Sequence, residues 1–547
     1  MIWILILIIP IILVFLFKLY LKKKELKNLD ALKENWGKPK EDEYFNFSYI
    51  EQYFLNTNNK KHSFHNISEQ TNKDLDLNQI FKYIDRTSSK IGQQYLYFKI
   101  RAIEKVDVLL EFDKLVKIFE NDEKLRISCQ TELAKLNKSS SYDLEKLVND
   151  IAIEKPKYHK VLIPLSLVSV FSIIIGFFNP VFFLFLIPLF IVNVVLHYKT
   201  KSYISYYLSA VSQLNTGLKV CKNLVLNEKI KSHFSDLSFI KVINKIRLKT
   251  SFISFEKKMD NEFAALLWMF LELVKIQFNI ESIIFYSFID DIIARNKSID
   301  NLFCFIGEID SAISIASVKY NNNNICKPIF VDAKDISIKK IIHPLIENCI
   351  PNDVHLYNNS LLLTGSNMSG KTTFIRTVAI NSILAQTLGF AFAKEFSIPF
   401  YKVLSSIKIE DDLIEDTSYY LKEVLTINEF IEFANGEYPC LFVLDEIFKG
   451  TNTVERISGG KAILSYLNKK ENFVFVSTHD IELAELLVNE NFDLYHFSEK
   501  IENNELFFDH KLKKGRLKTR NAIKILELYN YPKQIITDAR KIEKENF

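Results

Sequence analysis

One short stretch, residues 361–373, constrains the fold of this chain more than any other. It reads Leu-Leu-Leu-Thr-Gly-Ser-Asn-Met-Ser-Gly-Lys-Thr-Thr, an apolar strand that runs into a Gly-x-x-x-x-Gly-Lys-Thr pattern. A helical pattern over residues 374–380 follows at once. This order of strand, glycine-rich loop and helix is typical of a P-loop, whose backbone N–H groups surround phosphates. A chance glycine-rich turn is the alternative, and it does not account for the strand, the Lys-Thr pair and the helix together.

The predicted P-loop gives each residue type a role. Lys371 is expected to reach the β- and γ-phosphates, and the Thr372 hydroxyl to complete the ligand shell of Mg²⁺. The glycines let the backbone approach the phosphates without a clash from Cβ. The residues expected to bind ATP through this loop are Gly365, Ser366, Asn367, Met368, Ser369, Gly370, Lys371, Thr372 and Thr373. The stretch therefore predicts ATP and Mg²⁺ as ligands.

Two further apolar runs end in polar residues that suit the same chemistry. Residues 440–446 end in Asp445 and Glu446. We expect Asp445 to hold Mg²⁺, directly or through water, and Glu446 to act as general base toward the attacking water. Residues 473–480 end in Thr-His-Asp, where His479 can sense the γ-phosphate or be an incidental residue at a strand end. The pattern predicts an α/β P-loop NTPase sheet with its ligands at the carboxyl ends of the strands.

Residues 410–423 are harder to explain with one subunit. They form a turn cluster followed by a helix start, with Ser418 in the capping position and Glu423 early in the helix. A helix N-terminus that carries serine receives anions. The P-loop already supplies donors to its own nucleotide, so a γ-phosphate held by a second subunit is the expected ligand of Ser418. This arrangement predicts a homodimer that forms through the ATPase domains.

Two segments are too apolar for an ordinary soluble core. Residues 2–17 carry no charge, and lysines follow at 22–24, which predicts an N-terminal transmembrane anchor over residues 1–23. A cleavable signal peptide fits less well, because no basic residue precedes the run and no small-x-small cleavage site follows it. Residues 161–196 are also uncharged, and Asn-Pro at 179–180 divides them. Lysines on both flanks predict a transmembrane hairpin over 155–201, with a buried helical pair as the alternative.

These features divide the chain. We expect a polar tether or a small irregular subdomain over 24–74, a helical lever in two parts over 75–154 and 202–325, and the ATPase domain over 326–547. The predicted location is a membrane, crossed several times, with the ATPase domain in the cytoplasm. The net charge of +4 does not demand a nucleic-acid partner. The six cysteines are widely spaced, which favours reduced thiols over a metal or disulfide framework.

Residues 326–547 resemble the ATPase domain of the MutS family of DNA mismatch-repair proteins. The P-loop is similar to that family's T-G-P-N-M-G-G-K-S-T, and Ser477-Thr478-His479 resembles its A-T-H. Further matching segments are His343–Ile346, Ile350–Asp353, Asp411–Leu413 with Ser418 and Glu423, and Asp445–Thr453. Weaker similarity extends to the helical regions 75–154 and 202–325.

The resemblance implies a dimeric ABC-type ATPase in which Ser418 acts in trans and the tail around Pro532 forms dimerising helices. Ile350, which lies in one of the matching segments, is expected at the nucleotide, and His510 could cover the base. Cys349 stands where the family often has a phenylalanine that stacks on adenine. Double-stranded DNA is expected as a partner only because of this resemblance.

Departures from the family leave two functions open. The 24–74 segment is too short for the mismatch-reading and connector domains, and the hairpin interrupts the lever. The basic run 511–520 could contact phosphates, but a solvated face is the favoured interpretation. The first hypothesis is a membrane-anchored MutS-like ATPase coupled to binding of mismatched, branched or other DNA. The second is an ATP-driven switch that acts on unknown protein partners in the membrane, with no role in DNA or mismatch repair.

Overall fold

The computed structural model describes residues 23, 27, 29–40, 43–148, 155–253, 271–366, 369–408, 419–502, 505–516, 523, 526–527 and 529–546. The chain forms two compact units. Unit 1 comprises Met1–Lys61, Asp85–Phe98 and Phe112–Tyr320, and unit 2 comprises His62–Ile84, Lys99–Glu111 and Asn321–Phe547. Most of the predicted N-terminal anchor therefore lies outside the described residues.

Unit 2 is built on a six-stranded sheet in the order β14-β11-β6-β10-β9-β8. All neighbours are parallel except β14, which pairs antiparallel with β11. The strands are β6 (Ser360–Thr364), β8 (Lys402–Ser406), β9 (Cys440–Asp445), β10 (Phe473–Ser477), β11 (Phe492–His496) and β14 (Lys513–Lys514). The β6 and β10 strands are buried along their whole length, as expected of parallel strands covered on both faces.

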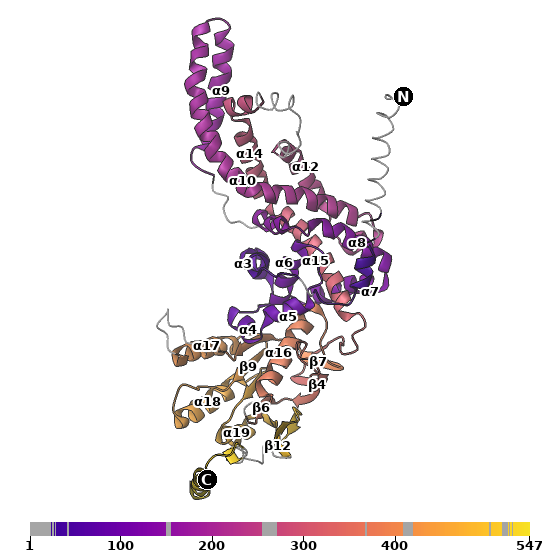
Figure 1. Ribbon diagram of the computed structural model, residues 1–547, viewed down its shortest axis with the longest axis vertical. Helices are drawn as coiled ribbons and strands as arrows, with labels where there is room; N and C mark the ends of the chain where they lie inside the picture. The colour runs from indigo at the N-terminus through magenta and orange to yellow at the C-terminus, as the bar shows by residue number, and fades with distance from the viewer. Residues whose placement is uncertain are drawn as a thin grey trace. The chain divides into compact units, whose positions relative to one another are not determined.

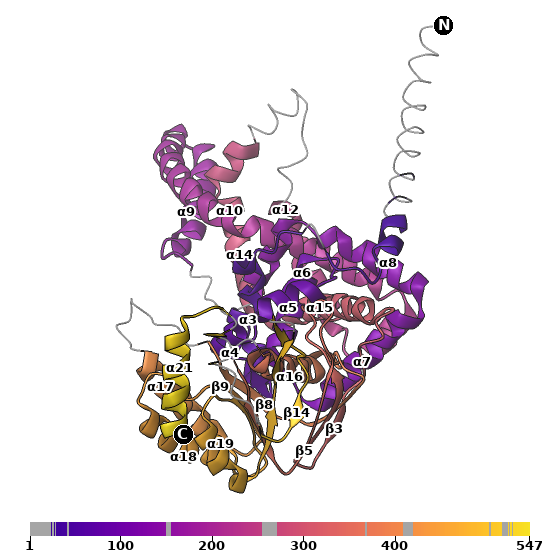
Figure 2. The same ribbon diagram turned by 60° about the horizontal axis from the view of Figure 1, so that its bottom comes forward.

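Helices cover this sheet. Helix α16 (Lys371–Leu388) packs on β8, β9 and β10. Helices α17 (Tyr419–Ala434), α18 (Thr453–Leu467) and α19 (Ile481–Leu487) share a separate apolar core with Leu362, Phe442 and Val474 of the strands. Figure 2 shows α17, α18 and α19 grouped together beside the sheet. The sheet is thus buried between helices, and its strand ends at one edge are left for polar side chains.

Smaller elements complete unit 2. A four-stranded sheet has the order β3-β7-β4-β5, and β12 pairs antiparallel with β13. The bounds are β3 (Ile329–Val331), β4 (Asp335–Ile341), β5 (Asn352–Tyr357), β7 (Glu395–Pro399), β12 (Glu499–Glu502), β13 (Glu505–Phe508), β1 (His65–Asn66), β2 (Ala102–Ile103), α4 (Glu69–Asp74), α5 (Leu77–Ile84) and α21 (Lys533–Asn546).

The structure differs from the predicted domain limits at residues 62–84 and 99–111, which belong to unit 2. The carboxylate of Asp74 holds α4 to the end of β8: it accepts hydrogen bonds from Ser405 Oγ at 2.7 Å, from Ile407 N at 3.0 Å and from Lys408 N at 2.8 Å. Three donors on one buried carboxylate make this a specific attachment. No periodicity in the sequence predicts this attachment of α4 to β8, because the hydrogen-bonded residues are more than 300 positions apart.

Unit 1 is helical. Its elements include α2 (Phe47–Ile50), α3 (Gln52–Asn56), α6 (Lys90–Arg101), α7 (Val106–Asn121), α8 (Glu123–Leu133), α9 (His159–Gly176), α10 (Leu186–Leu224), α11 (Glu228–His233), α12 (Ser238–Ile253), α14 (Ile280–Ala294) and α15 (Asn296–Lys319), of which α6 and α7 continue into residues of unit 2. Part of the predicted tether is therefore folded. Tyr53 of α3 is buried and stacks on Phe303 of α15 with ring centroids 4.2 Å apart. Short helices anchored by aromatic rings leave little amphipathic period, so the sequence pattern did not indicate them.

The predicted hairpin consists of α9 and the first part of α10, which pair beside each other (Figure 1), and α10 continues past residue 201 to Leu224. Asn179 caps the turn by accepting a hydrogen bond from Val181 N at 3.2 Å, and the 3₁₀ helix η4 (Pro180–Phe185) leads into α10. Among the described residues, three helical stretches are long and apolar enough to cross a membrane: His159–Gly176, Pro180–Lys201 and Asn296–Lys319. The first two are 22% and 11% buried and the third is 83% buried. Helix α15 is therefore an interior helix of unit 1, whereas the hairpin exposes its apolar surface.

Candidate active site

The candidate site begins at the carboxyl end of β6, a strand that lies between β10 and β11. The glycines at both ends of the following loop have left-handed backbone, with φ of 150° at Gly365 and 111° at Gly370. A Cβ at Gly365 would lie 2.9 Å from both Phe497 O and Ser369 Oγ, so a larger residue does not fit there. Helix α16 starts at Lys371, directly after Gly370. The turn therefore depends on glycine at both positions.

Lys371 turns back over this loop. Its Nζ donates to the carbonyls of Gly365 at 2.9 Å and Ser366 at 3.0 Å, and it lies 3.2 Å from His479 Nε2. Burial lowers the pKa of Lys371, while the nearby carboxylates of Asp445 and Glu446 act in the opposite direction. A half-desolvated ammonium in a loop of this kind is well placed to attract an anion.

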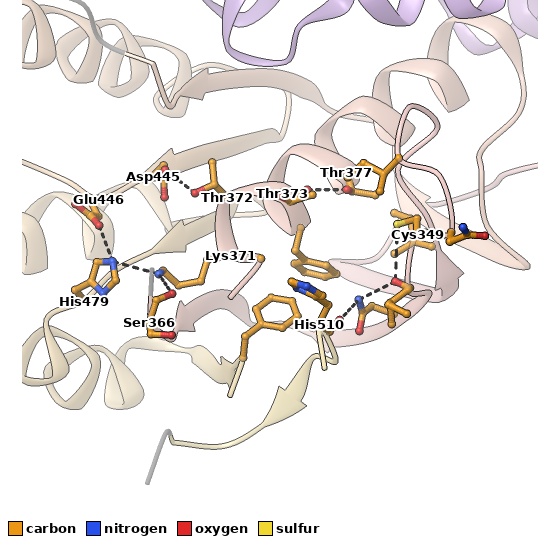
Figure 3. Close-up of a pocket in the computed structure, with 18 of the residues that line it drawn as sticks. Cys349, Ser366, Lys371, Thr372, Thr373, Thr377, Asp445, Glu446, His479 and His510 are labelled. Atoms are coloured by element: carbon orange, nitrogen blue, oxygen red, sulfur yellow. Dashed lines mark hydrogen bonds and ion pairs between the residues drawn. The ribbon is translucent and has the colours of Figure 1, made fainter. Parts of the chain in front are cut away.

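A second contact joins α16 to the end of β9. Thr372 Oγ1 donates to Asp445 Oδ2 at 2.8 Å, and Ser477 Oγ from β10 donates to Asp445 Oδ1. The register of the sheet explains this convergence, because Ser477 of β10 pairs with Asp445 on one side and with Leu363 on the other. Figure 3 shows Thr372 and Asp445 facing each other. A carboxylate and a hydroxyl at this spacing form a hard oxygen donor set of the kind Mg²⁺ prefers.

Glu446 and His479 form a third pair. Glu446 Oε1 lies 3.0 Å from His479 Nε2, and Glu446 Oε2 lies 3.3 Å from Lys449 Nζ. We assign a proton to His479 Nε2, which then donates to Glu446. A protonated ring nitrogen has no free lone pair, so it does not also accept a hydrogen bond from Lys371. The hydrogen bond from His479, assisted by the charge of Lys449, lowers the pKa of Glu446 to about 2. The carboxylate is therefore ionised at neutral pH and can accept a proton from, or orient, a bound water.

The loop that carries Glu446 is held from α17. Glu446 and Phe448 both have left-handed backbone, with φ of 59° at each. The N–H of Phe448 donates to Glu423 Oε1 at 2.5 Å, and the Glu423 side chain is buried. Burial raises the pKa of Glu423. Glu423 is thus a positioning residue for the Glu446 loop, a role that its place early in a helix did not reveal.

The opposite end of the same pocket is less polar. His510 Nδ1 lies 3.1 Å from Ser369 O, and Asn352 fixes the His510 segment by donating to His510 O at 3.0 Å and accepting from Leu512 N at 2.8 Å. One cavity of about 550 Å³ is lined by Cys349, Ile350 and His510 as well as by Lys371, Asp445, Glu446 and His479. Figure 3 shows Lys371 between Glu446 and His510. The volume of this cavity suits a ligand of the size of a nucleotide.

Two observations test whether the residues fit ATP with Mg²⁺. Ser369 Oγ is buried and has no hydrogen-bond partner among the described residues, although it lies in the loop that would surround phosphates. The paired oxygens of Thr372 and Asp445 offer the metal donors described above. A triphosphate would supply the missing acceptor and the counter-charge for Lys371, so the site fits the group.

The structure places the sequence-predicted residues as follows. Ser366, Gly370, Lys371, Thr372, Thr373, Asp445, Glu446, His479, Ile350 and His510 line the one cavity, and Gly365 and Ser369 flank it in the loop. Asn367, Met368 and Ser418 lie outside the described residues. Sequence reasoning missed the contact of Ser477 with Asp445. It also missed buried Glu499, whose Oε2 accepts from Ser366 Oγ at 2.5 Å. Glu499 follows the loop by more than 130 residues, so no local pattern could have indicated it.

Comparison with known proteins identifies the domain. Residues 361–546 match the family model described as MutS domain V. Three proteins named DNA mismatch repair protein MutS are similar to this chain. The one from Lactobacillus acidophilus is 32% identical over 253 residues (44% of this chain, 29% of that protein). The one from Aquifex pyrophilus is 29% identical over 265 residues (47% and 31%), and the one from Listeria welshimeri is 32% identical over 248 residues (43% and 28%).

The fold and this match define residues 361–546 as an α/β domain of the MutS domain V type, which is the ATPase-domain family of MutS proteins. The match over residues 361–546 confirms the resemblance of the C-terminal region to MutS proteins that the sequence motifs indicated. The chain spans less than a third of the length of these curated relatives.

Proposed function

We propose that the chain is a P-loop ATPase that binds ATP with Mg²⁺ in the cavity at the carboxyl end of β6 and hydrolyses it. The observation that carries this proposal is the meeting of Lys371, the Thr372–Asp445 pair and the Glu446–His479 pair at the ends of three adjacent parallel strands. Ligands of open α/β sheets bind at such an edge.

Each group has a step that suits it. Lys371 and the loop amides bind the β- and γ-phosphates, and Ile350 and His510 contact the nucleoside end. Thr372 and Asp445 would hold Mg²⁺, which when bound neutralises charge that develops on the phosphates. Glu446 orients the attacking water and accepts its proton, and His479 holds Glu446 in place while it senses the γ-phosphate.

The proposed active form is a homodimer. Ser418 of one subunit would complete the triphosphate site of the other, and the C-terminal helix α21 would join the two ATPase domains. The exposed apolar residues Ile535 and Ile542 of α21 support this part of the proposal. The proposed ATPase domain comprises residues 326–547, which residues 62–84 and 99–111 join in unit 2, and the other helical segments before it form the proposed lever.

We further propose that the hairpin crosses a membrane and that residues 1–23 form a second anchor, with the ATPase domain in the cytoplasm. The side chains that support the hairpin span are large, apolar and exposed. Phe177 and Phe178 at its tip are 79% and 86% exposed, and Leu184 is 64% exposed. A contiguous apolar surface of this kind on a helix pair is the mark of a lipid or protein contact.

The ligand that ATP hydrolysis serves has two candidates. The relatives named DNA mismatch repair proteins favour DNA, which would make the lever a DNA-responsive arm. The exposed hairpin favours the alternative, a switch that acts on membrane partners without DNA. Filter binding with homoduplex, mismatched and branched DNA, with and without ATP, separates them. Salt-sensitive binding supports the first, and no binding at low salt supports the second.

The ATPase proposal is tested with Glu446→Gln. We expect hydrolysis to fall by about 10²- to 10⁴-fold because the proton acceptor is lost, while ATP is still bound and is trapped. Lys449→Gln, which removes only the neighbouring ammonium, is the matched control and should lose far less. Unchanged turnover in Glu446→Gln would refute the proposal.

A further inference from the structure

Polar side chains along the two helices of the hairpin, away from its turn, are buried. Ser169 and Asn193 are fully buried, whereas Phe171 and Leu184 on the same two helical segments are 58% and 64% exposed. In a water-soluble helix pair the polar residues would face outward. Here these buried polar side chains contact a break between two helical segments elsewhere in unit 1.

That break lies between residues 271–277, which are helical, and α14, which begins at Ile280. Asn279 has left-handed backbone, with φ of 49°. A helix break leaves carbonyl groups without their usual partners. Unless they are hydrogen-bonded elsewhere, such groups are costly in any environment without water.

Both helices of the hairpin satisfy these groups. Ser166 Oγ of α9 donates to Phe278 O at 2.6 Å, and Ser169 Oγ donates to Gln277 O at 3.3 Å. From α10, Asn193 Nδ2 donates to Gln277 O at 2.7 Å, and Asn193 Oδ1 accepts from Asn279 Nδ2 at 2.8 Å. Three of the polar residues that interrupt the apolar hairpin, Ser166, Ser169 and Asn193, therefore hold the break.

Two carboxylates beside the break, those of Glu272 and Glu281, lie close to basic side chains. His197 lies one turn beyond Asn193, with Nε2 at 3.6 Å from Glu272 and Nδ1 at 4.0 Å from Glu281. Lys201 and Lys275 lie 3.6 Å and 3.5 Å from Glu272. Two carboxylates thus meet two ammonium groups and an imidazole. Such pairing is what allows ionisable groups to lie at a membrane boundary.

The depth of the break follows from its partners. Ser166 and Ser169 lie seven and ten residues beyond His159, which is about 10–15 Å along an α-helix. Helix α14 then runs back along α9, since the ring of Tyr286 is 5.7 Å from that of His159 and Asp290 pairs with Lys155. Meanwhile Leu271 and Leu273 are each 45% exposed and Ile280 is 36% exposed.

We propose that residues 271–286 form a third membrane element, a broken helix embedded in the leaflet on the lysine side of the hairpin. The partner of its exposed apolar side chains is the acyl region of that leaflet. Irregular backbone is tolerated at such depth only where protein groups satisfy it, which is the arrangement that Ser166, Ser169 and Asn193 provide. This inference rests on the proposed membrane hairpin and adds an element to it.

The test uses the full chain in liposomes, with a fluorescent amino acid introduced at one position at a time by codon suppression. The test positions are those of Leu273 and Ile280. Phe171 on the hairpin is the lipid control, and Leu226, which is 80% exposed beyond the hairpin, is the water control. Lipids brominated on their acyl chains quench from within the bilayer, and iodide quenches from water.

We expect the two test positions to match Phe171, with bromolipid quenching several-fold stronger than at Leu226 and with little iodide quenching. Iodide quenching at Leu273 and Ile280 beside a lipid-quenched Phe171 would overturn this inference and leave the hairpin proposal standing. Iodide quenching at Phe171 as well would overturn both.

A pair of variants tests what holds the break. Asn193→Leu removes the shorter of the two hydrogen bonds to Gln277 O and the acceptor of Asn279 Nδ2, and Val192→Leu changes the adjacent, 46% exposed residue. Asn193→Leu should raise iodide quenching at Ile280 at least twofold, and Val192→Leu should not. Equal quenching in the two variants would contradict the role of the polar contacts.

Discussion

The sheet of unit 2 and the hairpin of unit 1 place apolar side chains in opposite ways. Leu361, Leu362 and Leu363 of β6 are fully buried, and polar groups gather where the strands end. On the hairpin, Phe178 is 86% exposed while Asn193 is fully buried. A high content of apolar residues therefore forms a buried core in unit 2 and an exposed surface suited to lipid on the hairpin. Hydropathy alone does not separate these cases, but the direction of the polar residues does.

The comparison predicts unequal costs for one kind of substitution. Leu362→Ala in the core of unit 2 should lower the free energy of unfolding of that unit by about 2–5 kcal/mol, because it leaves a cavity. Leu184→Ala on the hairpin should change the free energy of unfolding of unit 1 by less than about 0.5 kcal/mol, since the Leu184 side chain is 64% exposed. Denaturant unfolding in detergent measures both. Equal losses would show that the hairpin is a packed core like the sheet.

At the polar strand ends, Lys371→Ala should weaken ATP binding about 100-fold, because charge-assisted hydrogen bonds to phosphate are lost. Lys339→Ala is the control, since Lys339 is exposed and pairs only with Glu395 among the contacts described for it. Equilibrium binding of a fluorescent ATP analogue measures the difference. Similar affinities in the two variants would remove Lys371 from the site.

Acid should weaken unit 2 through Glu446. Its pKa is about 2 in the folded chain against an ordinary value of 4.5, so the stabilisation it provides is present above pH 4.5. It is lost as the pH falls from 4.5 through 2, because the unfolded chain then binds the proton more tightly. The loss attributable to this group is about 1–3 kcal/mol after allowance for its partial exposure. Glu446→Gln should flatten the dependence of unfolding on pH in this window, and an unchanged slope would contradict the assignment.

The smallest effect is expected at Glu423, which acts through the Glu446 loop. Glu423→Ala leaves the Phe448 N–H without its acceptor and should lower kcat about 10-fold with little change in KM. Glu429→Ala on the same helix, which alters an exposed side chain, is the control. Steady-state kinetics with ATP separate kcat from KM. A change in KM alone would mean that Glu423 serves binding and does not position Glu446.

How much could be predicted from the sequence follows from distance along the chain. The loop over 361–373 and the ends of β9 and β10 are contiguous patterns, so their residue types and the sheet edge they share could be predicted. The bond of Glu423 to Phe448 and that of Glu499 to Ser366 join separate elements and carry no local pattern. The helix break at Asn279 was hidden for the same reason, because the residues that satisfy it lie on the hairpin.

We propose that one chain carries both an ATP site and a lipid-facing hairpin. The most direct test reconstitutes the full chain in liposomes, washes them with alkaline carbonate, restores neutral pH and measures Mg²⁺-dependent ATP hydrolysis in the pellet and the supernatant. We predict that the protein and its activity stay with the lipid, and that Lys371→Ala abolishes the activity without releasing the protein. Activity that persists in Lys371→Ala would contradict the ATP site, and protein that leaves with the wash would contradict the membrane hairpin.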